Sequence, residues 1–157
     1  MSVTVVKRPM NELNEVGDRL LVIFDGHCGF CNRTVRWFLR RDRMDRLRFV
    51  PSESPLVSAL LARHGMSAHC SEQGPETVVV VRDAGGAKER VLIRSDAAKE
   101  LLSELPQPWR AAGAVFGWIP RPVGDLGYRL VARWRYRIWG RLDSCPVPTS
   151  AERARFL

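Results

Sequence analysis

Residues 20–32 read LLVIFDGHCGFCN, and this stretch predicts how the fold begins. The short apolar run Leu20–Asp25 stops at Gly26, which is typical of a buried strand followed by a turn. From Cys31 to Leu39 the apolar residues recur at helical spacing, while arginines occupy the other face. The stretch therefore predicts a strand that passes through a tight turn into a helix.

The following segments extend this beginning into an α/β sheet. Further strands are expected at 47–50, 77–82 and 90–93, and further helices at 56–64, 95–105, 109–118 and 123–139. The last two strands are expected to pair as an antiparallel hairpin, and Ser95 to cap the helix after them. A break at Pro120 and Pro122 is expected to separate the final two helices. The order β-α-β-α-β-β-α plus a helical extension predicts the α/β class.

Length and composition favour a single folded domain. The chain has 157 residues, 45% of them hydrophobic, and its 25 Lys+Arg against 17 Asp+Glu give a formal net charge of +8. That length is sufficient to bury a core without disulfides. We expect an N-terminal arm at 1–19, one domain carrying the motif cysteines at 20–105, and a helical extension at 106–157 packed on that domain.

Neither a targeting signal nor a transmembrane segment is expected. The first 19 residues lack the apolar core of ~7 or more residues that a secretory signal needs. The longest apolar stretch, 111–119, is about half of the ~20 residues that span a bilayer. We therefore expect a cytoplasmic protein, in which four cysteines indicate catalysis or metal binding before structural disulfides.

Cys28 and Cys31 form a CxxC motif where the first strand meets the first helix. The unpaired N–H groups and the macrodipole at a helix N-terminus lower a cysteine pKa from ~8.5 toward ~3.5–7.5. Cys31 falls on the buried face of the helix, where desolvation keeps a thiol protonated. We predict that an exposed Cys28 attacks a disulfide and that Cys31 resolves the mixed disulfide.

Three neighbouring residues are expected to influence this pair. His27, if charged, and Arg33, the first of seven arginines between residues 33 and 48, would lower the thiolate pKa. A loop histidine without a role is the alternative for His27. Asp25 has two possible roles, as a proton relay to Cys31 or as an acceptor for backbone N–H groups of the turn.

Other functions remain open for the same residues. Cys28 and Cys31 could ligate zinc together with His69 and Cys70, as a non-catalytic binding domain. Otherwise Cys70 and Cys145 are interpreted as bystander thiols.

The basic helix at 128–141 could serve a membrane surface or nucleic acid as part of a basic interaction domain. We favour an amphipathic helix that covers the sheet with its apolar stripe and leaves its arginines in solvent, and we expect no nucleic-acid partner.

The run from Phe24 to Pro51, FDGHCGFCNRTVRWFLRRDRMDRLRFVP, resembles the signature of the DCC family of thiol-disulfide oxidoreductases. The family is named for an aspartate and two cysteines, which are Asp25, Cys28 and Cys31 in this sequence. The segments IRSDAAKELLSEL, IPRPVGDLGYRLVARWRYRIWGR and SCPVPTSAERARFL resemble the family as well. The resemblance implies a thioredoxin-like fold and protein-disulfide reductase or related activity.

Two departures from ordinary thioredoxins accompany the resemblance. Their buried acid lies well upstream of the first cysteine, whereas Asp25 precedes Cys28 by three residues. They also carry a cis-proline directly before the third strand, and Pro75 stands near that position, so a cis Gly74–Pro75 bond is predicted. Cys145 lies in a stretch similar to the family's C-terminal motif, which suggests a structural role near the site.

We therefore predict a cytoplasmic thiol-disulfide oxidoreductase of the protein-disulfide reductase type. Its substrates are expected to be protein or small-molecule disulfides. It is expected to need no metal, flavin or nicotinamide of its own, and to receive electrons from an external thioredoxin or glutathione system.

Overall fold

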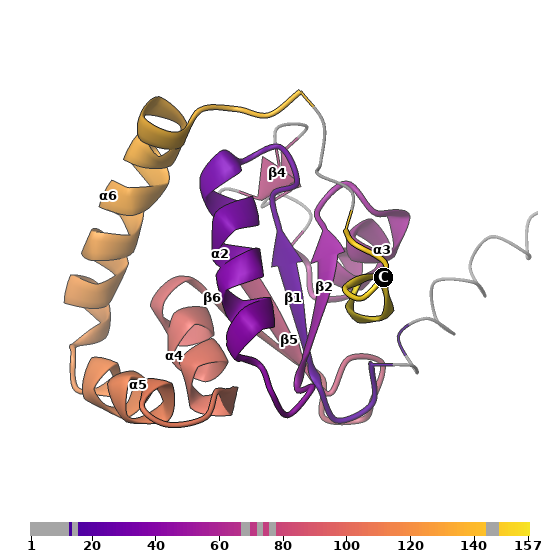
Figure 1. The fold of residues 1–157 in the computed structure, drawn as a ribbon, viewed down its shortest axis with the longest axis horizontal. Helices are drawn as coiled ribbons and strands as arrows, with labels where there is room; N and C mark the ends of the chain where they lie inside the picture. The colour runs from indigo at the N-terminus through magenta and orange to yellow at the C-terminus, as the bar shows by residue number, and fades with distance from the viewer. Residues whose placement is uncertain (1–12, 14–15, 67–69, 72–73, 76–77, 144–147) are drawn as a thin grey trace, which may run out of the picture.

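The fold is described by a computed structural model that covers residue 13 and residues 16–66, 70–71, 74–75, 78–143 and 148–157. Its strands are β1 (Leu20–Phe24), β2 (Leu47–Pro51), β3 (Cys70–Ser71), β4 (Gly74–Pro75), β5 (Val79–Arg82) and β6 (Arg90–Ile93). Its helices are α2 (Gly29–Arg41), α3 (Pro55–Arg63), α4 (Arg94–Glu104), α5 (Trp109–Gly117), α6 (Arg121–Trp139) and the short 3-10 helix Arg153–Arg155. Figure 1 shows how these elements are arranged.

Four strands form one mixed sheet in the order β2-β1-β5-β6. β1 runs parallel to β2 and antiparallel to β5, and β5 and β6 form the expected antiparallel hairpin. β1 lies in the interior of the sheet, and its five residues are all buried, which explains why its sequence is apolar throughout instead of alternating. The predicted α/β, thioredoxin-like fold is confirmed.

Side chains of β1 point alternately to the two faces of the sheet, as strand geometry requires. Leu21 and Ile23 belong to a buried cluster with α3. Leu20, Val22 and Phe24 belong to a second cluster with α2 and α4. The sheet therefore has helices on both faces, and each face has its own core.

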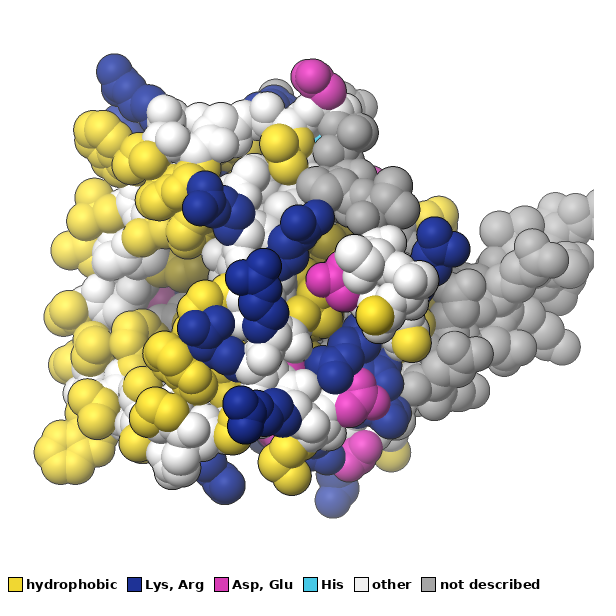
Figure 2. Space-filling model, in the orientation of Figure 1, with side chains coloured by type: hydrophobic (Ala, Val, Ile, Leu, Met, Phe, Trp, Pro, Cys, Tyr) yellow, Lys and Arg dark blue, Asp and Glu magenta, His cyan; other side chains and the backbone are white. Residues whose placement is uncertain are grey.

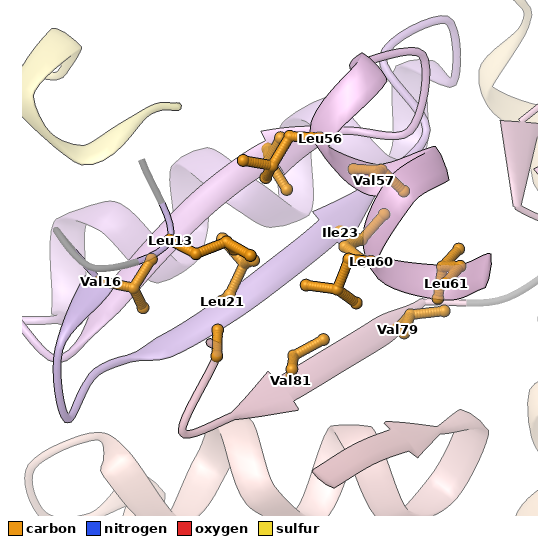
Figure 3. Close-up of a cluster of buried hydrophobic side chains, with 12 residues drawn as sticks. Leu13, Val16, Leu21, Ile23, Leu56, Val57, Leu60, Leu61, Val79 and Val81 are labelled. Carbon is orange, nitrogen blue, oxygen red and sulfur yellow. The ribbon is translucent and has the colours of Figure 1, made fainter. Parts of the chain in front are cut away.

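The core on the α3 face is closed and apolar (Figure 3). Leu60 and Leu61 are fully buried in it, and Leu13 and Val16 join it from the segment before β1. Each such side chain stabilises the fold by roughly 1.5–3 kcal/mol relative to an exposed one. The side chains of this cluster are all apolar, and the cluster contributes stability.

The far end of the chain covers the edge of the sheet. The N–H of Leu157 donates to the carbonyl of Phe49 at 3.0 Å, and Phe156 forms an isolated parallel bridge with Phe49. An exposed strand edge invites pairing with other chains, so this contact protects β2.

Two helix starts differ from the sequence prediction. The predicted N-cap at Ser95 is wrong, because α4 already begins at Arg94. Ser95 is buried, and its hydroxyl donates to Asp125 of α6 at 2.7 Å, so it joins two helices instead of capping one. Pro122 does not break the chain before α6 but lies in its first turn, where a missing N–H is tolerated.

The predicted packing of α6 through its apolar stripe is also wrong. Leu130, Trp134 and Ile138 are 53%, 47% and 61% exposed. The opposite side of the helix, which carries Tyr128 and Arg135, turns toward the fold, and Figure 1 shows α6 lying along the outside of α2 and α4. The polar contacts of that inner side, described below, explain why α6 turns this side toward the fold instead of its apolar stripe.

Candidate functional site

The turn between β1 and α2 places Cys28 at the N-cap of the helix. Its backbone is extended, its N–H donates to the carbonyl of Asp25 at 3.3 Å, and its Sγ accepts the N–H of Cys31 at 3.3 Å. The sulfur therefore occupies the place that a serine or aspartate oxygen commonly takes at a helix start.

The two thiols have opposite ionisation behaviour. The side-chain hydrogen bond with Cys31, the N–H of Cys31 and the charge of Arg135 lower the pKa of Cys28 to about 6, although burial opposes them. The hydrogen bond to Cys28 and burial raise the pKa of Cys31 well above its usual range. Both directions agree with the predicted asymmetry, while the roles of attacker and resolver remain predictions.

The predicted exposure of Cys28 is wrong, since the residue is 0% exposed, against 8% for Cys31. Residues 139–142, which we call the strap, cross the start of α2. Cys28 forms an antiparallel bridge with Arg141, and the N–H of Leu142 donates to the carbonyl of His27 at 2.7 Å. The strap therefore covers the thiol expected to react.

Gly29 permits this crossing. A Cβ on residue 29 would lie 2.7 Å from the carbonyl oxygen of Trp139, a separation that real Cβ atoms do not show. The rings of Phe30 and Trp139 also meet, with centroids 4.7 Å apart. The absent side chain at position 29 is thus a requirement of the closed strap.

Arg135 of α6 reaches into the site and was missed in the sequence. It is buried, its Nη1 donates to the Sγ of Cys31 at 3.4 Å, and its Nη2 lies 3.8 Å from Oδ2 of Asp25. Burial lowers the pKa of Arg135, but the charges of Cys31, Tyr136 and Cys28 outweigh burial and raise it. A signal was present, because Arg135 follows Tyr128 by seven residues and so shares its side of the helix.

Asp25 connects the turn to α6. Its Oδ1 accepts the backbone N–H of His27 at 2.9 Å, so the turn-fixing contact expected from the sequence is present. Its Oδ2 accepts the hydroxyl of Tyr136, whose pKa is raised by burial and by this bond. The buried carboxyl therefore belongs to one hydrogen-bonded group with Tyr136, Arg135 and Cys31.

Asn32 is a second residue that sequence reasoning missed. It is buried on α2, and its Nδ2 donates to the carbonyls of Gly26 at 2.7 Å and Cys28 at 3.0 Å. A buried amide that bonds two turn carbonyls fixes the loop around the motif. Its position directly after the CxxC was the available signal.

The other predicted site residues lie around this centre. The Nδ1 of His27 is 3.2 Å from the carbonyl of Leu142, and its Nε2 is 3.8 Å from Oε1 of Glu53. The side chain of Arg33 is exposed on α2, and its effect on Cys28 remains a prediction.

The remaining predicted site and ligand residues are Pro75, His69, Cys70 and Cys145. The backbone of Pro75 lies in β4, opposite Cys70 in β3, and the cis bond at Pro75 stays a prediction. His69 and Cys145 lie outside the described residues. Within the described ranges, no group of three or more His, Cys, Asp or Glu side chains could hold a metal ion.

An apolar cavity of about 200 Å³ adjoins the site between α2, α4 and α6. Phe30, Val35 and Val131 are among its apolar walls, and Cys31 and Arg135 also face it. The second cysteine therefore borders an apolar space, while the first lies under the strap.

A dithiol at the start of the helix that follows β1 of a thioredoxin-like sheet defines the class of thiol-disulfide exchange proteins. The model of the DCC1-like thiol-disulfide oxidoreductase family matches residues 22–141, and the chain belongs to this family.

Two relatives extend the comparison. The chain is 29% identical over 143 residues to the uncharacterized protein YuxK of Bacillus subtilis, covering 91% of this chain and 96% of that one. It is 30% identical over 133 residues to a chloroplastic DCC family protein of Arabidopsis thaliana, covering 85% and 72%. No solved structure matches the chain. Among the described residues, no helix combines the length and apolar character needed to cross a membrane.

Proposed function

We propose that this protein is a thiol-disulfide oxidoreductase of the protein-disulfide reductase type that works through Cys28 and Cys31. The observation that carries the proposal is the position of Cys28 at the N-cap of α2, where its Sγ accepts the N–H of Cys31 at 3.3 Å. This contact lowers the pKa of Cys28 to about 6, while the bond to Cys28 and burial raise the pKa of Cys31. A thiolate at neutral pH beside a protonated partner is the arrangement that two-step exchange requires.

The reaction follows from this pair. The Cys28 thiolate attacks one sulfur of the client disulfide, forms a mixed disulfide and releases the other client sulfur as a thiolate. Cys31 then loses its proton and attacks Sγ of Cys28, which frees the reduced client and leaves a Cys28–Cys31 disulfide. Two electrons from an external thioredoxin or glutathione system restore the dithiol. We assign this cycle to the cytoplasm.

Arg135 and Asp25 support the second step. The guanidinium that donates to Sγ of Cys31 stabilises the negative charge that develops there. Asp25 is the proposed acceptor of the Cys31 proton, because its buried carboxyl shares a hydrogen-bonded group with Arg135. Asp25→Asn should therefore accumulate the mixed disulfide between Cys28 and the client. If Asp25 only fixes the turn, Asp25→Asn should resolve the mixed disulfide at the wild-type rate.

An insulin-reduction assay with the wild type, Cys28→Ser and Cys31→Ser tests the function. We expect both variants to lose turnover, and Cys31→Ser alone to trap client proteins as mixed disulfides. If Cys31→Ser traps nothing and Cys28 titrates as an ordinary thiol, the assignment of attacker and resolver is wrong. Stoichiometric zinc with unreactive thiols in the purified protein would instead support the metal-binding domain.

The strap adds a condition on access, because a client sulfur reaches Cys28 only after the strap moves. Gly29→Ala should displace the strap and speed alkylation of Cys28 by iodoacetamide, as measured by mass spectrometry. Gly127→Ala is the matched control, since a Cβ there meets nothing within 4 Å. Equal alkylation rates in the two variants would show that the strap does not limit access.

A further inference from the structure

The outer side of α6 is an apolar stripe exposed to solvent. Its members recur three or four residues apart along the helix, namely Val123, Leu126, Leu130, Trp134 and Ile138, and each is between 47% and 61% exposed. α5 adds Val115 at 72%, and Trp118 follows it at 90%. Of the ten large hydrophobic side chains that are exposed in the described part of the chain, nine lie between residues 115 and 139.

We call this surface the outer face and define it by the five stripe residues of α6 together with Val115 and Trp118. Figure 2 shows hydrophobic side chains gathered over α5 and α6, apart from the basic side chains along α2. Contiguous apolar patches of this kind are uncommon on soluble monomers and mark sites of contact with another phase or partner. The inner side of α6 is already occupied by the contacts of Tyr128 and Arg135, so the outer face is not needed for folding.

A row of positive charge borders the stripe. Arg129, Arg133 and Arg137 follow one another at intervals of four residues, and all three are exposed. The one acidic residue of α6, Asp125, accepts the hydroxyl of Ser95. An apolar stripe with tryptophan, flanked by arginine and lacking free acids, is the composition of helices that lie in a membrane interface.

We propose that α5 and α6 bind an anionic phospholipid surface through the outer face. The apolar stripe would enter the boundary between headgroups and acyl chains, and Arg129, Arg133 and Arg137 would contact lipid phosphates. The helix would lie in the plane of the surface, since its inner side remains packed on α2 and α4.

Charge favours lipid over a second copy of this chain. In an antiparallel two-fold contact through the stripe, the same flank of each helix meets itself. The arginine row would then face an identical row across the contact, namely Arg129, Arg133 and Arg137 of the second copy. Rows of like charge repel each other. An anionic surface neutralises the row instead, which is why we commit to lipid.

Co-sedimentation with vesicles of phosphatidylglycerol or phosphatidylcholine tests this proposal on the full chain. We expect the reduced protein to bind the anionic vesicles at low salt and to bind the neutral ones at least about tenfold more weakly. Leu130→Asp should weaken binding to the anionic vesicles by about tenfold or more, because one large apolar side chain no longer inserts. Met44→Asp is the matched control, since Met44 is 69% exposed and lies outside the outer face.

The charge row has its own pair of variants. Arg133→Glu with Arg137→Glu should reduce binding to the anionic vesicles by more than tenfold. The same charge reversal at the exposed Arg90 of β6 should change it less than twofold, as expected for a distant charge. Far-ultraviolet circular dichroism shows whether each variant keeps the fold.

Three results would overturn the proposal. The first is wild-type protein that binds neither vesicle, and the second is equal binding to both. The third is a wild type that is dimeric in sedimentation velocity and becomes monomeric in Leu130→Asp without vesicle binding, which would assign the outer face to a second copy.

Discussion

The two faces of the central sheet differ in what they bury. Against α3 the sheet packs a cluster of apolar side chains, with Val57, Leu60 and Leu61 fully enclosed. Against α2 and α6 it carries an apolar core as well, but also the buried pair Asp25 and Arg135 and a cavity of about 200 Å³. The first face contributes packing alone, whereas the second combines packing with buried polar groups and a cavity beside the Cys28–Cys31 pair.

Removing the buried charge from the α2 face should have the largest effect. Arg135→Met leaves the Asp25 carboxyl buried without its cation, which costs about 3–5 kcal/mol of unfolding free energy. Denaturant unfolding measures this loss. Arg133→Met, on the exposed side of the same helix, is the control and should change stability by less than about 0.5 kcal/mol. Similar losses in both variants would mean that the Arg135 contacts contribute no specific stability.

The α3 face should respond to a loss of volume. Leu60→Ala leaves a cavity in a closed apolar core and should destabilise the protein by about 2–5 kcal/mol, without changing the pKa of Cys28. Chemical unfolding and a thiol titration of the same variant test both parts. A shifted thiol pKa in Leu60→Ala would show that the two faces are coupled.

The pH at which Cys28 ionises should distinguish it from an ordinary thiol. With a pKa of about 6, Cys28 is protonated below pH 6 and becomes a thiolate as the pH rises through that value. The ultraviolet absorbance of the thiolate should therefore rise near pH 6, and Cys28→Ser should abolish that step. Arg135→Met should move the step upward, because the Arg135 charge lowers this pKa. The assignment is contradicted if the step that Cys28→Ser removes lies near pH 9 instead of near pH 6.

The smallest expected effect compares two neighbouring alanines of α4. Ala98 lines the cavity, whereas Ala97 is fully buried in the core. Ala98→Leu should be neutral or stabilise by up to about 1 kcal/mol through filling space. Ala97→Leu should cost about 1–3 kcal/mol through overpacking. Equal losses in thermal unfolding would show that the cavity does not accept a side chain.

Local patterns in the sequence were sufficient for the sheet and for the dithiol. The run Leu20–Phe24 is buried on both sides and therefore apolar throughout, and the CxxC falls directly after its turn. The direction of both thiol pKa shifts was predicted from that placement, and the charge of Arg135 adds to the lowering at Cys28. These features depend on neighbours within a few residues, which is why pattern reasoning reached them.

Contacts between distant segments were not accessible in this way. Arg135 is 104 residues from Cys31, and its spacing from Tyr128 places it on one side of α6 without indicating that this side faces the dithiol. The orientation of that helix was wrong for the same reason, since hydrophobic patterning favours burial of the apolar stripe. The strap buries Cys28 because its backbone crosses the start of α2. The glycine at position 29, which leaves room for that crossing, is the one sign of it in the sequence.

The strap has a thermodynamic consequence for client selection. The N–H of Leu142 in the strap donates to the carbonyl of His27. Because the strap belongs to the same chain, its effective concentration at this carbonyl is on the order of millimolar. A disulfide client that uses this backbone acceptor has to displace an intramolecular competitor before its sulfur meets Cys28. In the proposed exchange reaction, we therefore expect clients with an extended segment beside the disulfide to react faster than small disulfides.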